Sequence, residues 1–279
     1  MKRQPFSVLM SVYIKENPDF FDLSLNSILH NQTVSPDELI LICDGPLNEQ
    51  LDAVINKYLL EYPEILKVHR LEENKGLGMA LNIGLTKCSH ELIARADSDD
   101  ICASNRFEIQ LAYFEEHPEV HIVGSNISEF KNNVDEKHQR IKKMPLTHKK
   151  IYKYTKFRSP LNHMTVMFKK SAILSVGSYQ PLLLLEDYYL WARLICNGYV
   201  FANINKVLVY ARVGNGRIER RSSSSLECYK KINEYMYEHK FISKSQMKMN
   251  LFIRKCFMIS PKWIKKLFYK VTRRKNNSQ

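Results

Sequence analysis

Hydrophobic runs and amphipathic segments alternate along the first 125 residues. Four short apolar runs are predicted strands: residues 6–13, 38–43, 66–70 and 91–97. Three segments between them repeat apolar residues at helical spacing: residues 19–32, 47–59 and 76–87. Strands that alternate with helices predict parallel βαβ units with right-handed crossovers. We therefore expect an α/β protein with a Rossmann-like, mostly parallel sheet flanked by helices.

The pattern changes after Phe130. Residues 131–143 are polar and charged, and a second block of apolar runs follows. This block predicts strands at 165–168 and 207–210 and helices at 185–197 and 226–239. At 279 residues, the chain has the length of one large domain or of two closely joined halves. We divide it into residues 1–125, 126–225 and 226–279, the last part being a basic helical extension.

Three carboxylates, Asp97, Asp99 and Asp100, lie where the fourth predicted strand ends. Acids this close repel one another unless a cation holds them. Mg²⁺ or Mn²⁺ suits such a cluster, because hard divalent ions take oxygen ligands and leave positions for water and phosphate. The alternative interpretation is a polar turn, in which Asp is common.

Two other polar residues follow predicted strands, Tyr13 after the first and Asp44 after the second. Open parallel sheets bind ligands beyond the carboxyl ends of their strands, so we expect Tyr13, Asp44 and Asp97 at one edge. The sequence has no G-x-G-x-x-G after the first strand and no P-loop motif. A dinucleotide-dependent oxidoreductase and a P-loop NTPase are therefore disfavoured.

Glu186 and Asp187 begin a predicted helix within a very apolar stretch, residues 182–191. The helix dipole favours acids at a helix N-terminus, which would by itself explain one of them. Apolar surroundings raise the pKa of a carboxyl group and suit a general base. The pair is therefore a candidate for proton transfer.

The net charge of +13 is concentrated near the C-terminus. Twelve of the 42 Lys and Arg residues lie from Lys240 onward, where the sequence has no Asp or Glu. One helical stripe of apolar residues in this tail consists of Trp263, Ile264, Leu267, Phe268 and Val271, and residues 251–257 add a second apolar surface. A basic amphipathic helix of this kind is typical of binding to an anionic membrane surface.

Two other interpretations of the tail, residues 240–279, are a helix docked on the body with a solvated basic face, and a nucleic-acid-binding segment. The rest of the chain is nearly neutral and carries no nucleic-acid-binding motif, so we expect no nucleic-acid partner. The six cysteines show no zinc or redox spacing and are interpreted as reduced thiols. No apolar run reaches the ~20 residues of a spanning helix, and the N-terminus lacks a signal-peptide core. We expect a cytoplasmic protein on the inner face of the cytoplasmic membrane.

The ordered motifs up to about Ser225 resemble an inverting family 2 glycosyltransferase with the GT-A fold. The motifs are residues 8–13, Asp44, residues 74–84, residues 95–100 with Arg106 and Gln110, and residues 162–171, 177–179, 186–191 and 212–214. Each motif is weak alone, but the set in this order is specific. The later motifs are similar to bacterial enzymes that extend O-antigen or capsule repeat units. Those enzymes typically use UDP-glucose or UDP-galactose and a lipid-diphosphate-linked sugar acceptor.

The resemblance implies a donor site at the sheet edge. Asp99 would bind the divalent metal, Mn²⁺ or Mg²⁺, that bridges the diphosphate of the UDP-sugar. Asp97 would contact the ribose or the metal. Asp44 would accept hydrogen bonds from the uracil, with Val12 and Tyr13 packing around the base.

The resemblance also implies that Lys75 and Arg95 contact the nucleotide and that Asp187 is the catalytic base. Residues 1–125 would form the nucleotide-sugar-binding half, and residues 126–225 the acceptor-binding and catalytic half. In an inverting transfer the base takes a proton from the acceptor hydroxyl while the metal offsets charge on the leaving UDP. No protein nucleophile is needed.

The chain departs from the family pattern at several positions. Ile14 replaces the usual Asn, and no His follows Arg212 closely. Arg220 and Arg221 form either a loop that closes over the diphosphate or a solvated basic loop. His163 lines the acceptor site or, the favoured interpretation, packs in the fold.

Two other classes remain open from the sequence alone. A nucleotidyltransferase would also use an α/β fold and metal-binding acids, but residues 11–15 are not a glycine-rich phosphate loop. A non-catalytic sugar- or nucleotide-binding module would not need Asp187 in an apolar helix start together with a metal site.

Overall fold

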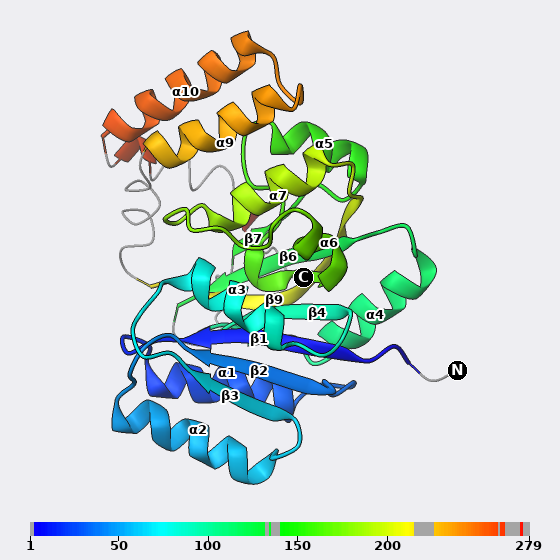
Figure 1. Cartoon of the computed structure of the whole chain (residues 1–279), viewed down its shortest axis with the longest axis vertical. Coiled ribbons are helices and arrows are strands. Elements are labelled where there is room, and N and C mark those ends of the chain that lie inside the picture. The colour runs from blue at the N-terminus through cyan, green and yellow to red at the C-terminus, as the bar shows by residue number, and fades with distance from the viewer. Residues whose placement is uncertain are drawn as a thin grey trace.

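The structure is a computed structural model that describes residues 3–131, 134, 140–214, 226–261, 263–265 and 274–275. Its first part confirms the predicted alternation of strands and helices (Figure 1). The elements are β1 (Phe6–Val12), α1 (Pro18–Leu29), β2 (Glu38–Cys43), α2 (Glu49–Glu61), β3 (Leu66–Arg70), α3 (Leu77–Lys87) and β4 (Leu92–Asp97). β1 pairs in parallel with β2 and β4, and β2 pairs in parallel with β3. The carboxyl ends of these four strands therefore lie at one edge of the sheet.

Local sequence explains where the first helices begin. Asn17 caps α1 by accepting hydrogen bonds from the backbone N–H groups of Asp19 and Phe20. Asn48 caps α2 in the same way through the N–H of Leu51. An Asn side chain at this position satisfies donors that the first helical turn leaves unpaired.

Alternate residues of the central strands face opposite sides of the sheet, as the pleat requires. Leu9 and Ile42 pack in the core shared with α3 and with α7 (Glu186–Cys196). Val8 and Leu41 pack in the core shared with α1, α2 and α4 (Arg106–Glu116). Helices cover both faces of the sheet, which fits strands that read as continuous apolar runs.

The second part of the chain adds mainly antiparallel strands. Its remaining elements are β5 (Ile101–Cys102), β6 (Ile122–Phe130), β7 (Arg140–Lys142), α5 (His148–Thr155), η1 (His163–Thr165), β8 (Met167–Lys169), α6 (Lys170–Ser175), β9 (Phe201–Arg212), α9 (Leu226–Glu238), α10 (Lys244–Ile259) and β10 (Arg274–Lys275). β8 lies between β4 and β6 and is antiparallel to both. β6 also pairs in parallel with β9. The expected mostly parallel α/β sheet is present, with these strands added beside β4.

Several of these elements were not predicted from the sequence, among them α4, β6 and α5, and β9 begins six residues before the predicted strand. The helix α10 lies within the predicted helical extension, although its bounds were not predicted. β6 crosses the division expected between residues 125 and 126, because it runs from Ile122 to Phe130 within the shared sheet. The division into three parts stays a prediction.

The C-terminal helices form one end of the molecule (Figure 1). α10 packs on α9, and α9 packs on α7. Within the described part of the chain, no helix combines the length and hydrophobicity needed to cross a bilayer. The predicted Arg220–Arg221 loop and the stripe residues Leu267, Phe268 and Val271 lie outside the described residues. All six cysteines are free thiols.

Candidate active site

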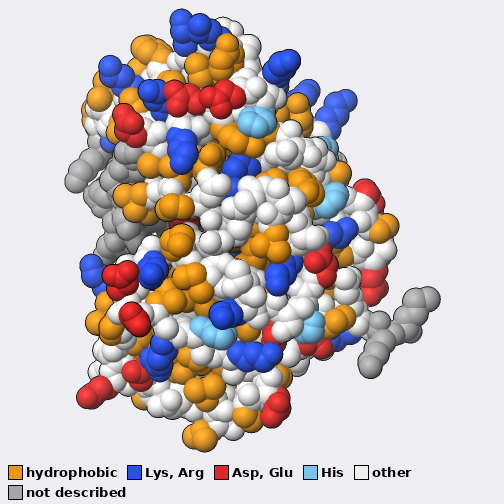
Figure 2. Space-filling view, viewed as in Figure 1, with side chains coloured by type: hydrophobic (Ala, Val, Ile, Leu, Met, Phe, Trp, Pro, Cys, Tyr) orange, Lys and Arg blue, Asp and Glu red, His pale blue; other side chains and the backbone are white. Residues whose placement is uncertain are grey.

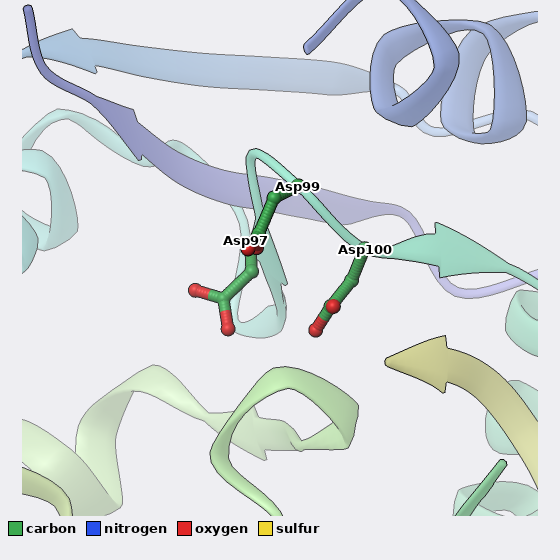
Figure 3. A group of neighbouring side chains, drawn as sticks. All are labelled: Asp97, Asp99 and Asp100. Atoms are coloured by element: carbon green, nitrogen blue, oxygen red, sulfur yellow. The ribbon is translucent and has the colours of Figure 1, made fainter. Parts of the chain in front are cut away.

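The three predicted acids lie together on the loop that joins β4 to β5 (Figure 3). One carboxylate oxygen from each of Asp97, Asp99 and Asp100 lies within 4.8 Å of the other two. Asp97 and Asp100 point to the same side of the loop (Figure 3). Three carboxylate oxygens at this spacing match the ligand preference of Mg²⁺ and Mn²⁺. The sequence analysis grouped all three acids as a candidate metal cluster, and the family resemblance implied metal-binding roles for Asp97 and Asp99.

Contacts from distant parts of the chain hold this acidic loop. Arg212, at the end of β9, donates from its backbone N–H to Oδ1 of Asp100 at 2.8 Å and from Nε to the carbonyl of Asp99 at 3.1 Å. The Ser24 hydroxyl of α1 donates to the carbonyl of Asp97 at 2.8 Å. The Ser98 hydroxyl donates to the carboxylate of Glu16, in the loop that precedes α1. The conformation of the acidic loop is therefore held by contacts with α1, with the loop before α1 and with β9, and not by the acids alone.

Arg95 is the cation of this site. Its side chain is buried, with the residue 1% exposed, and its Nη2 forms an ion pair with Oδ1 of Asp97. Burial alone would lower the pKa of Arg95, but the charge of Asp97 and its hydrogen bond raise it above its ordinary value. Nε and Nη1 of Arg95 have no hydrogen-bond partner among the described residues. Buried donors are usually paired, so these two nitrogens are candidates for binding a substrate group.

The backbone around Arg95 is fixed by a second buried arginine. Arg106 donates from Nη2 to the carbonyl of Arg95 at 2.7 Å and from Nε to Gln110 at 3.0 Å. The N–H of Arg95 donates to the carbonyl of Val166 at 2.9 Å. Arg106 and Gln110, which follow the acids closely in sequence, thus hold the backbone of Arg95 from α4.

Asp44 connects two loops at the same sheet edge. Its carboxylate accepts hydrogen bonds from the backbone N–H of Lys75 at 2.7 Å and of Gly76 at 3.0 Å. Gly45 has a φ of +88°, and a Cβ there would lie 2.8 Å from the backbone N of Asn74. Only glycine permits this close approach. The conformation of residues 74–76 therefore depends directly on Asp44.

The other predicted nucleotide contacts lie beside Asp44. The buried residue Val12 accepts the backbone N–H of Asp44 at 2.8 Å. Tyr13 is 38% exposed at the end of β1. The ammonium of Lys75 lies 3.6 Å from Glu73, and both side chains are exposed. Val12, Tyr13, Asp44 and Lys75 thus share one edge with Asp97, as the strand order predicts.

Glu186 and Asp187 form the first turn of α7. The Ser159 hydroxyl donates to Oδ2 of Asp187 at 3.3 Å. Glu186 lies against the first turn of α3, where a Cβ added at Gly78 would be 3.4 Å from the Cβ of Glu186. Burial, together with the charge of Asp187, raises the pKa of Glu186 to about 7. The sequence predicted a raised pKa for this pair, and the structure assigns that shift to Glu186.

The acids of the β4–β5 loop and the acids of α7 affect the pKa values of the same neighbouring groups. The pKa of Glu186 also responds to the charges of Arg95 and Asp97. The pKa of Tyr179 is raised by burial, lowered by Arg95, and raised by Asp187, Glu186 and Asp97. The acids of the β4–β5 loop and of α7 therefore belong to one electrostatic site.

His163 packs at the border of this site. Its Nε2 and the Tyr179 hydroxyl are 2.9 Å apart, and its ring lies 6.1 Å from that of Trp191. Burial and the charge of Arg95 lower the pKa of His163 well below its ordinary value, so the ring is neutral at neutral pH. This environment fits the favoured interpretation of a packed histidine.

Comparison with known proteins identifies the class of enzyme to which this site belongs. The profile of Glycosyl transferase family 2 matches residues 7–181. Amylovoran biosynthesis glycosyltransferase AmsE of Erwinia amylovora is 43% identical over 216 residues, which are 77% of this chain and 79% of that protein. A UDP-Gal:alpha-D-GlcNAc-diphosphoundecaprenol beta-1,3-galactosyltransferase of Escherichia coli is 41% identical over 266 residues, 95% of each chain.

Solved structures give the same fold. S. aureus TarS 1–349 in complex with UDP-GlcNAc superposes with a TM-score of 0.67 at 21% identity, covering 92% of this chain and 74% of that one. The chain belongs to glycosyl transferase family 2 and is a glycosyltransferase with a GT-A-like fold. The nucleotidyltransferase and the non-catalytic binding module are thereby set aside. Asp187 lies outside the matched residues 7–181, so its role stays a prediction.

Proposed function

We propose that this glycosyltransferase moves a hexose, glucose or galactose, from a UDP-sugar to a saccharide linked through diphosphate to a polyprenyl lipid, in O-antigen or capsule synthesis. The relative that is similar over 95% of the chain is named for a UDP-Gal donor and a diphosphoundecaprenol acceptor. One observation carries the proposal. The acids of the β4–β5 loop and the carboxyls of α7 share an electrostatic site, with the buried Arg95 beside it.

The donor would bind along the sheet edge. Asp44 would accept hydrogen bonds from the uracil, since a carboxylate oxygen can accept more than the single backbone bond it now receives. Val12 and Tyr13 would pack around the base. Lys75 would contact the nucleotide through its exposed ammonium group.

Asp97 and Asp99, together with Asp100, would hold Mn²⁺ or Mg²⁺. The cation would offset the negative charge that develops on the departing UDP. Arg95 would donate from Nε and Nη1, which have no partner among the described residues, to the diphosphate or to the sugar. Burial keeps this guanidinium in place before the donor arrives, so little reorganisation accompanies transfer.

Asp187 would remove the proton from the acceptor hydroxyl as that oxygen attacks the anomeric carbon from the face opposite UDP. The bond from Ser159 to Oδ2 fixes the orientation of this carboxylate. Glu186, whose pKa is raised to about 7 by burial and by the charge of Asp187, is partly protonated near neutral pH.

The test measures UDP release from UDP-glucose and UDP-galactose with a sugar-diphosphate-lipid acceptor, with Mn²⁺ and with EDTA. We expect metal-dependent, acceptor-dependent release and an inverted product. D187N should reduce kcat by at least about 100-fold, because the loss of a general base typically costs 10²–10⁴-fold, while UDP affinity is retained. If UDP affinity collapses in D187N and turnover persists, Asp187 is not the base.

We also propose that the tail, residues 240–279, holds the enzyme at the anionic inner surface of the cytoplasmic membrane, where a lipid-linked acceptor resides. Along α10 and just beyond it, five apolar side chains are exposed: Met249, Phe252, Ile253, Ile259 and Trp263. Exposed Lys244, Lys248 and Lys255 accompany them. Figure 2 shows Lys and Arg side chains beside hydrophobic ones at the α9–α10 end of the molecule. This mixture of apolar and cationic side chains suits an anionic lipid surface.

A further inference from the structure

The inward side of α10 contacts the loop that leads to the candidate base. The buried Asn250 donates from Nδ2 to the carbonyl of Lys156 at 2.7 Å and to Oδ1 of Asn233 at 2.8 Å. Arg254 follows Asn250 by one helical turn and therefore lies on the same side of α10. The C-terminal helices thus place a guanidinium next to residues 156–159.

Tyr229 of α9 is the point where Arg254 and Arg158 meet. The Tyr229 hydroxyl donates to the carbonyl of Phe157 at 2.6 Å, and its ring centroid lies 5.5 Å from Cζ of Arg254. Burial raises the pKa of Tyr229, while Arg254 and Arg158 oppose that rise, so both positive charges act on the same hydroxyl. Two arginines from different segments therefore converge around one aromatic side chain.

Arg158 also connects this region to Asp187. Its neighbour Ser159 donates to Oδ2 of Asp187, and the ring of Tyr188 lies 6.2 Å from that of Tyr229. Arg158 itself donates from Nη1 to the Tyr154 hydroxyl at 3.2 Å, with its Cζ 5.6 Å from the ring of Tyr154. The arginines lie on the α9–α10 side of Asp187, whereas the β4–β5 acids and Arg95 lie on the α3 side with Glu186.

We propose that Arg158 and Arg254 bind the diphosphate of the lipid-linked acceptor. This inference rests on the proposed function. In an acceptor with a single sugar the attacking hydroxyl and the diphosphate are carried by the same ring, so the proposal takes this acceptor and needs an anion site about one sugar ring from the base. Planar guanidinium groups match phosphate oxygens in paired hydrogen bonds and keep their charge at every physiological pH. The lipid would then leave along α10, which carries exposed apolar residues.

The test compares two acceptors that carry the same sugar: an α-diphosphate ester with an alkyl tail, and an α-alkyl glycoside without the diphosphate. Each is assayed with the wild-type enzyme, R158Q and R254Q. We expect either variant to raise the KM for the diphosphate acceptor about 10- to 100-fold, the loss typical of a charge-assisted hydrogen bond. The KM for the simple glycoside should change less than about twofold, since that acceptor lacks the group.

Matched variants separate recognition from folding. R254K keeps the charge without the planar fork and should retain part of the affinity for the diphosphate acceptor. K150Q removes an exposed cation from α5, outside the tail and the site, and should leave both KM values unchanged. Equal losses on both acceptors in R158Q and R254Q would show a structural role only and would overturn the proposal, as would unchanged KM values.

Direct binding distinguishes this proposal from the proposed function. Calorimetry with UDP present measures the affinity for the diphosphate acceptor without requiring turnover. Binding that is weakened in R158Q and R254Q supports the diphosphate site even if no hexose is transferred, in which case the proposed reaction alone fails. Binding of equal strength in all variants overturns the diphosphate site even if transfer is observed.

Discussion

Glu186 is a carboxyl group held where its charge is disfavoured. Burial and the neighbouring Asp187 raise its pKa to about 7, whereas an unfolded chain restores the ordinary value of 4.5. The folded protein therefore binds this proton more tightly than the unfolded chain does. The contribution of the group to stability is greatest below pH 4.5 and is lost as the pH rises through about 7.

E186Q should therefore become more stable than the wild type as the pH rises. We expect the two melting temperatures to be close at pH 4.5 and that of E186Q to be about 2–4 °C higher at pH 8.5, the shift expected for roughly 1 kcal/mol in a chain of this size. Thermal unfolding at intervals between these pH values measures the difference. E64Q, at an exposed position, is the control and should differ from the wild type by a constant amount. A pH-independent difference for E186Q would contradict the expected proton binding.

Candidate site residues could be predicted from the sequence where they stand close together in a short motif. Asp97, Asp99 and Asp100 lie within four consecutive positions, so their clustering is a local property. The contact of Arg212 with Asp100 joins residues 112 positions apart, and no local pattern encodes it. The raised pKa of Glu186 was equally hidden, because it depends on burial and on the packing of α3 against this side chain.

At the scale of elements, β6 shows why the second half of the chain was harder to predict. All nine of its residues are buried, yet they include Ser125, Asn126 and Glu129. Sequence periodicity identifies a strand by alternating or continuous apolar residues, and β6 has neither. Its polar groups are satisfied within the fold, for example by the bond from Asn126 to Asn205 at 3.1 Å. Such a strand becomes recognisable only once its neighbours are in place.

Two glycines of α3, Gly78 and Gly84, differ in how closely the neighbouring atoms pack around them. A Cβ at Gly84 would lie 2.4 Å from Cδ1 of Leu9 and 2.8 Å from Cγ1 of Ile42, whereas a Cβ at Gly78 would meet only ordinary contacts. G84A should therefore destabilise the protein by about 1–3 kcal/mol, the usual cost of overpacking a core. G78A should cost little, because Ala favours the helix over Gly by roughly 0.5–1 kcal/mol. Equilibrium urea unfolding of both variants measures this contrast, and equal stabilities would contradict the close packing of α3 on β1 and β2.

At the scale of the whole molecule, the candidate active site lies between the parallel strands of the first part of the chain and the C-terminal helices. The parallel strands β1 to β4 bring the predicted nucleotide contacts to one edge. On the other side of Asp187, α7, α9 and α10 pack in sequence toward the exposed basic surface (Figure 1). A water-soluble donor and a lipid-linked acceptor could thus approach one carboxylate from different directions. The alternation of strands and helices predicted the donor side, but the helix layers depend on long-range packing that the sequence alone does not display.

The proposed attachment of the tail to the membrane would place α10 against the lipid, and this predicts how the protein binds vesicles. Phe252 is 68% exposed and Ile253 is 54% exposed on α10. Replacing both with Glu, as F252E/I253E, removes apolar insertion and adds repulsion from anionic headgroups. Because burying one such side chain is worth about 1.5–3 kcal/mol, we expect at least a tenfold loss of binding to phosphatidylglycerol-containing vesicles. The wild type should bind neutral phosphatidylcholine vesicles weakly, and its binding to anionic vesicles should decrease at high salt.

A control at the opposite end of the molecule makes the vesicle experiment decisive. Leu60 of α2 is 85% exposed, so L60E adds a charge to an equally exposed apolar position far from α10 (Figure 1). L60E should bind anionic vesicles as the wild type does. If F252E/I253E and L60E bind equally, or if the wild type does not distinguish anionic from neutral vesicles, α10 is not the membrane surface. If the wild type is instead a dimer in solution that F252E/I253E converts to monomers, a second copy of the chain covers this surface. Sedimentation of the same three proteins without lipid separates that outcome from lipid binding.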